Sequence, residues 1–132
     1  MTTLETKFKI ESWDEKPYRE TDDKRKWTRS DVALTGTEGL TSGSFEALMY
    51  YRPDGTGTWL ALLHFAGELD GRSGSFVLEG RGSFDGTSAT TEAVITPGSG
   101  TGDLAGISGS GVSVSTHADY PYMPFTLTYD LA

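Results

Sequence analysis

Hydrophobic and polar residues alternate along most of this chain with the two-residue period of a β-strand. Near the N-terminus Phe8 and Ile10 stand between charged neighbours, and from Phe125 to Leu131 every second residue is a large hydrophobic one. A strand with this pattern buries one face and exposes the other. Helical periodicity is almost absent, so the pattern predicts an all-β protein.

Three Asp-Gly pairs divide the alternating segments. They lie at Asp54-Gly55, Asp70-Gly71 and Asp85-Gly86, and Asp-Gly is typical of tight hairpin turns because glycine tolerates a positive φ angle. Their regular spacing predicts long antiparallel strands joined by short turns. The expected strands are Leu4–Trp13, Arg25–Gly36, Thr41–Tyr51, Thr58–Leu69, Ser73–Phe84, Ser88–Thr96, Ile107–Thr116 and Met123–Leu131.

A meander of such long strands favours closure into a barrel, because an open sheet would leave two unpaired edges. We therefore expect an eight-stranded antiparallel up-and-down barrel, whose interior suits packed side chains or one small ligand. Two stretches, Trp13–Asp23 and His117–Pro124, are expected to be irregular, the second as a rim loop or lid. No linker divides the chain, so residues 1–132 form a single β-barrel domain.

Composition narrows the classes of partner and compartment. The chain has 132 residues, no cysteine and a net charge of −8, which argues against a nucleic-acid partner and excludes thiolate chemistry. The N-terminal segment lacks the apolar core of a signal peptide, and no apolar run is long enough to span a membrane. We therefore expect a cytoplasmic protein without a membrane partner.

Six glycines fall in the fifteen residues from Pro97 to Gly111. Part of this run fits the G-x-G-x-x-G/A pattern of dinucleotide sites, which requires a helix to open at the last glycine. Here glycines and β-branched residues such as Ile107, Val112 and Val114 follow, and they are poor helix formers. The run therefore predicts a strand-to-strand corner with close backbone approach.

The same glycine run carries a family resemblance. VITPGSGTGDLAGISGSG is similar to the glycine signature of a bacterial family called DUF3224. Further segments also resemble motifs of that family: Trp13–Tyr18, Leu48–Tyr51, Gly71–Phe76 and Leu127–Leu131. The resemblance covers nearly the whole chain.

The resemblance implies the eight-stranded antiparallel barrel of the allene oxide cyclase-like superfamily. Dirigent proteins and some polyketide cyclases, including ones that perform Diels–Alder-type reactions, share this architecture. The chain departs from the family pattern at Leu63, where relatives often carry a glutamate just before the position of His64. If that acid is catalytic in relatives, its loss here puts that role in doubt.

Strands Phe45–Tyr51 and Trp59–Phe65 are apolar on both faces. One face should line the barrel interior, and a homo-oligomer interface is the expected cover for the other. Alternation leaves open which of two sets of residues points into the barrel: Trp59, Ala61, Leu63 and Phe65, or Leu60, Leu62, His64 and Ala66. We favour the first set inside, because its aromatic residues and the small Ala61 suit a ligand cavity.

Candidate catalytic residues are few. Glu46 and Glu92 lie in otherwise uncharged strands, where a lumen-facing carboxylate could act as an acid or base, although both could equally face water. His64 could transfer protons or simply lie at an interface or rim. The expected substrate-binding residues are Trp13, Tyr51, Trp59, Phe65, Phe76 and Tyr129. The two histidines are far apart and no carboxylate clusters with them, so we expect no metal and no other cofactor.

These observations favour a small barrel that binds one largely apolar molecule in its lumen. The resemblance suggests a cofactor-free cyclase or isomerase acting on a polyketide or oxygenated lipid-like substrate, chiefly by positioning it and excluding water. Two alternatives remain open: a carrier of a hydrophobic ligand that performs no reaction, and a structural oligomer with a filled core. An open cavity with an inward carboxylate favours the enzyme, and a lumen filled by side chains favours the structural role.

Overall fold

Eight antiparallel strands close into a barrel in the computed structural model, which describes residues 1–131. Each strand pairs with its neighbours in sequence, and β8 pairs with β1. The strands are β1 (Thr2–Glu20), β2 (Lys26–Gly36), β3 (Leu40–Tyr51), β4 (Gly57–Leu69), β5 (Arg72–Phe84), β6 (Ser88–Ile95), β7 (Ser108–Thr116) and β8 (Tyr122–Asp130). Two short 3-10 turns, η1 (Gly102–Leu104) and η2 (His117–Asp119), follow β6 and β7. The all-β barrel predicted from the alternation is confirmed.

The three Asp-Gly pairs lie in the turns where they were expected. The turn between β4 and β5 consists of Asp70 and Gly71, both with positive φ angles of 51° and 78°, which is the backbone conformation that such hairpins require. Gly55 and Gly86 also have positive φ, in the β3–β4 and β5–β6 turns. The strand boundaries that flank these turns differ from the predicted ones by one residue at most.

The N-terminal strand is longer than its sequence pattern predicts. β1 continues into the stretch Trp13–Asp23, which was expected to be irregular, and ends at Glu20. Its pairing with β2 contains a register shift between Ile10 and Ser12, where one extra residue forms a β-bulge. The bulge reverses the parity of the strand, so Phe8 and Ile10 face inward before it and Trp13 and Glu15 face inward after it.

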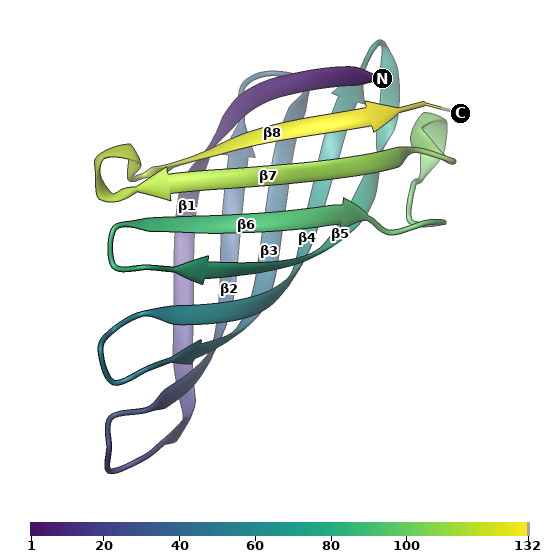
Figure 1. Cartoon of the computed structure of the whole chain (residues 1–132). Helices are drawn as coiled ribbons and strands as arrows, with labels where there is room; N and C mark the ends of the chain where they lie inside the picture. The colour runs from purple at the N-terminus through teal and green to yellow at the C-terminus, as the bar shows by residue number, and fades with distance from the viewer. Residues whose placement is uncertain (132) are drawn as a thin grey trace.

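The barrel is flattened into two crossing layers (Figure 1). β6, β7 and β8 cross in front of the upper parts of β1–β5, and the two chain ends lie close together. β1 runs beside β8 over Thr2–Lys9 and then turns away to pair with β2. Four hairpin turns therefore gather at one end of the barrel, and the remaining connections gather at the other.

Phenylalanine rings fill the middle of the barrel. Phe65 stacks on Phe8 with ring centroids 4.7 Å apart and meets Phe125 edge-on at 5.2 Å, and Phe76 lies 6.2 Å from the same ring. All four side chains are buried. They come from β1, β4, β5 and β8, so the contacts cross the lumen. This packing leaves the middle of the lumen to side chains of the protein.

The glycine-rich run covers one end of the barrel rather than forming a simple corner. It runs along the first half of β5, where Thr101 donates its backbone N–H to the Ser75 carbonyl at 2.9 Å and Ser99 accepts the Val77 N–H at 3.1 Å through its hydroxyl. Two side chains of the run itself, Leu104 and Ile107, are buried. The absence of side chains on its glycines lets this loop take the place that β6, which is shorter, leaves beside β5.

In the described part of the chain no helix is long and apolar enough to cross a membrane.

Candidate functional site

At the end of the barrel opposite the glycine-rich loop, several inward-facing aromatic side chains remain partly accessible to solvent. Trp13, Phe45, Tyr51 and Trp59 face inward in the registers of β1, β3 and β4, yet none of them is buried, and Trp13 is 46% exposed. Trp13 meets Phe45 edge-on with centroids 5.7 Å apart. Inward-facing aromatic side chains that remain accessible are typical of the mouth of a binding site.

One carboxylate points into this mouth. Glu15 accepts three hydrogen bonds: from Trp13 Nε1–H to Oε1 at 2.9 Å, from the Thr28 hydroxyl to Oε2 at 2.9 Å, and from the Tyr51 hydroxyl to Oε2 at 2.8 Å. The donors come from three neighbouring strands, and Thr28 is buried. Glu15 itself is half-buried. Three donors fix the carboxylate in one orientation.

The phenol of Tyr51 stays protonated under ordinary conditions. Partial burial raises the pKa of Tyr51 well above its usual range, and the hydrogen bond to the Glu15 carboxylate and its negative charge raise that pKa further. The Lys26 ammonium lies over the Tyr51 ring, 5.1 Å from its centroid. The mouth thus combines a fixed hydrogen-bond acceptor with a phenol that remains a donor.

The raised pKa of Tyr51 predicts a loss of stability at alkaline pH. Below the ordinary tyrosine pKa of about 10 the stabilisation is fully present, and above it the unfolded chain ionises first, so stability falls towards the higher folded-state pKa. Tyr51→Phe should therefore make the free energy of unfolding less dependent on pH above that value. Denaturant titrations across the alkaline range measure this, with the exposed Tyr18→Phe as the control. An unchanged slope in Tyr51→Phe would contradict the assignment.

Further inward-facing polar groups line the wall next to Glu15. Ser30 is buried beside it and lies within 3.5 Å of Met49 Sδ. Trp59 packs against Gly82 and donates its Nε1–H to the Thr91 hydroxyl at 3.1 Å. A side chain on Gly82 would collide with the indole, so the glycine determines where this aromatic wall of the mouth lies.

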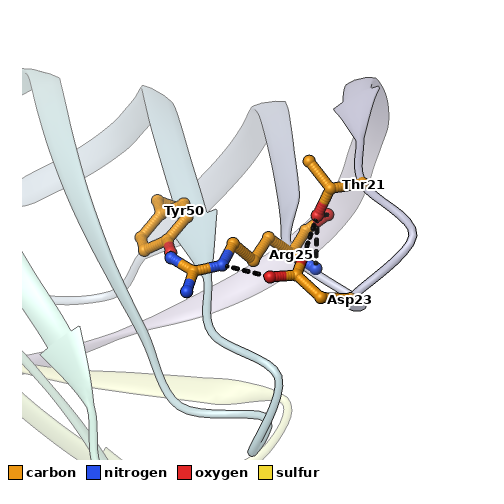
Figure 2. Close-up of polar contacts among 4 residues, drawn as sticks. All are labelled: Thr21, Asp23, Arg25 and Tyr50. Carbon is orange, nitrogen blue, oxygen red and sulfur yellow. Dashed lines mark hydrogen bonds and ion pairs between the residues drawn. The ribbon is translucent and has the colours of Figure 1, made fainter.

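A polar cluster on the outside braces the turn next to the mouth. Figure 2 shows Arg25 donating through Nε to Asp23 at 2.8 Å and through Nη1 to the Tyr50 hydroxyl at 3.0 Å, while Thr21 donates to Asp23 and accepts the Arg25 backbone N–H. The hydrogen bond from Thr21 and the Arg25 guanidinium lower the pKa of Asp23. The cluster ties the β1–β2 turn to β3, which is separated from β1 by β2.

The three expected catalytic residues lie on the outer face of the barrel. Their inward neighbours Ala47, Leu63 and Ala93 are buried, which places Glu46, His64 and Glu92 outside. Glu46 and His64 lie together there, with Oε1 and Nε2 3.4 Å apart in an ion pair when the imidazole is protonated, and Glu92 is not part of this pair. The structure thus brings none of them to the lumen.

The expected substrate-binding residues separate into two groups. The predicted parity of β4 is confirmed, because Ala61, Leu63 and Phe65 are buried while Leu60 and Leu62 are exposed. Trp13, Tyr51 and Trp59 lie at the mouth. Phe65, Phe76 and Tyr129 belong to the packed core.

Tyr129 lies away from the mouth. It donates its hydroxyl to Asp70 Oδ2 at 3.0 Å, which ties β8 to the β4–β5 turn at the covered end of the barrel. Among residues 1–131 no three histidine, cysteine or acidic side chains are grouped to hold a metal ion.

Sequence reasoning did not single out Glu15, although it lies in the Trp13–Tyr18 segment that carries part of the family resemblance. The strand was expected to end at Trp13, and the parity change at the bulge cannot be read from alternation alone. The available signal was the pair Trp13 and Glu15, two residues apart and therefore on one face of any strand.

Comparison with known proteins places this barrel in a family. The model of a family described as "Protein of unknown function (DUF3224)" matches residues 4–129. The chain belongs to the DUF3224 family. Its structure is similar to the crystal structure of a DUF3224 protein of unknown function from Shewanella oneidensis MR-1, with a TM-score of 0.77 and 23% identity over 100% of this chain and 98% of that one. No curated protein matches this DUF3224 member. At this identity the likeness establishes the shared fold.

Proposed function

We propose that the open end of this barrel binds one small, largely apolar molecule that carries a carbonyl or hydroxyl group, and that the protein is a cofactor-free isomerase or cyclase. The observation that carries the proposal is the Glu15 carboxylate, held by three donors among half-exposed aromatic side chains. Rings at Trp13, Phe45 and Trp59 would contact the apolar body of the ligand. The ligand reaches only this end, because Phe8 and its neighbours fill the middle of the lumen.

The two polar groups suit a proton transfer next to a carbonyl. When the substrate binds, the Tyr51 hydroxyl, whose single proton is directed at Glu15 Oε2 in the free protein, turns to the carbonyl oxygen. The Glu15 carboxylate removes a proton from the carbon beside the carbonyl, and the Tyr51 hydroxyl donates its hydrogen bond to the oxygen, where negative charge develops. The proton then returns to the same carbon or to a conjugated one, which gives an isomer without any change of oxidation state. Cyclisation of a flexible substrate would use the same walls to hold it in a reactive conformation.

Deuterium exchange into a model ketone tests this chemistry. The probe is β-tetralone, an apolar bicyclic ketone with acidic C–H bonds beside its carbonyl, incubated with the protein in D2O and analysed by mass spectrometry. The wild type should accelerate exchange, and Glu15→Gln should reduce the protein-catalysed rate at least about 100-fold, since a positioned base contributes about that much. Tyr51→Phe should reduce the rate by a smaller factor.

Glu46→Gln is the matched control, because that carboxylate lies on the outer face. It should exchange the probe like the wild type. Quenching of tryptophan fluorescence by the probe, measured in the same samples, separates binding from reaction. Saturable binding without exchange would favour the carrier, and absence of both would overturn the proposed site.

A further inference from the structure

A broad depression lies on the outer surface of the barrel, on the side of the sheet that faces away from the lumen. It has a volume of about 1190 Å³ and crosses seven of the eight strands, from Arg29 on β2 to Thr128 on β8. At the usual strand spacing its path around the barrel wall is roughly 30 Å long.

Small inward residues produce the depression. Ala47, Ala61, Gly80, Ala93 and Gly111 are paired from strand to strand in one continuous row. There is no room for a larger side chain in this row: a Cβ on Gly80 would stand 2.8 Å from the Glu92 carbonyl oxygen. The strands approach the core along the row, and Figure 1 shows β5 curving from the rear layer into the front one. The outer surface is hollowed where the strands approach the core.

Exposed aliphatic side chains line the depression. Leu48, Leu60, Leu62, Val94 and Val112 all contribute to it, and Leu60 and Val94 are 58% and 61% exposed. Five large aliphatic residues on one continuous surface form an apolar patch of the kind that marks an interaction site in a water-soluble protein. Water would be released from these side chains if a partner covered them.

Charges of both signs share this surface. Glu46 pairs there with His64 of the same chain, and four other charged residues form no ion pair within the described part of the chain. Arg29, Arg81, Glu79 and Glu92 line the depression, and within residues 1–131 none of them forms an ion pair. In a two-fold symmetric pair, the arginines of one copy can face the glutamates of the other. A strongly acidic or basic partner would leave one set of these charges opposed by like charges.

We propose that the depression is the interface of a homodimer, in which a second copy of this chain covers the exposed leucines and valines and pairs the unpartnered arginines with glutamates. The sequence gives the same expectation, because β3 and β4 carry apolar residues on both faces and the outer faces therefore need a cover. The interface leaves the mouth at Glu15 free, because the depression and the mouth lie on opposite faces of the strands. The proposal of a dimer therefore does not depend on the proposed reaction.

Two charge-reversed proteins test the interface by analytical ultracentrifugation at micromolar concentration. Arg29→Glu/Arg81→Glu makes the surface wholly acidic, and Glu79→Lys/Glu92→Lys makes it predominantly basic. Each variant alone should dissociate, with a Kd at least about tenfold higher than that of the wild-type dimer. An equimolar mixture of the two should regain a dimer, because opposite charges then face one another.

Lys9→Glu/Lys16→Glu is the matched control, since it changes the net charge by the same amount on β1, outside the depression. It should remain dimeric. Leu60→Ser tests the apolar component and should also dissociate, while its near-ultraviolet circular dichroism stays that of the folded barrel. A monomeric wild type, or a dimer that survives in both charge-reversed variants, would overturn the proposal.

Discussion

Phe65→Ala should lower the free energy of unfolding by about 3–5 kcal/mol, the usual cost of removing a large aromatic side chain from a core. The Phe65 ring is 1% exposed and contacts the rings of Phe8, Phe76 and Phe125. The Phe65 ring also lies against Gly43, where a Cβ would stand 2.6 Å from it. Because glycine has no side chain, nothing at this position can fill the space that the ring leaves. Urea titration followed by circular dichroism measures the loss.

Val114→Ala is the control for this variant, because Val114 is an exposed aliphatic residue on β7. Its effect should stay within about 0.5 kcal/mol, as for most surface substitutions. A loss below about 1 kcal/mol for Phe65→Ala would show that the ring is poorly packed. The lumen would then have room for a ligand in its middle, and the binding site would extend inward from the mouth.

The turns and strands were predictable because their signals are local. An Asp-Gly pair such as Asp70-Gly71 specifies its own backbone angles. The alternation of hydrophobic and polar residues on either side shows which residues share a face of the strand. Closure of the sheet into a barrel was predictable as well, because a meander of long strands leaves two edges that need a partner. Strand ends that depend on such signals were placed to within a residue or two.

The candidate site was less predictable because it depends on parity and on contacts across the barrel. A single bulge next to Glu11 turns Glu15 inward, while the parity of β3 turns Glu46 outward. Alternation shows only that residues two apart share a face. The contact of Phe8 with Phe65, between strands that are not neighbours, depends on how far the strands are staggered in the closed barrel.

Gly74→Val should lower the free energy of unfolding by about 3 kcal/mol, because it separates the glycine-rich loop from β5. A Cβ at Gly74 would stand 2.0 Å from the Thr101 carbonyl oxygen, which belongs to the backbone and cannot rotate away. Moving the loop would expose its own buried side chains, Leu104 and Ile107, and each buried aliphatic side chain contributes about 1.5–3 kcal/mol. Urea titration again measures the change, and faster hydrogen exchange at the Thr101 amide would locate it.

Ser73→Val separates this effect from a general response of β5 to valine. Ser73 is exposed and adjacent to Gly74, and valine suits a strand, so this control should keep wild-type stability. Because the loop covers the end of the barrel opposite Glu15, Gly74→Val protein that remains folded should still exchange deuterium into β-tetralone. Loss of exchange with retention of fold would mean that the two ends are coupled through the packed phenylalanines, and the filled lumen would then be part of the site.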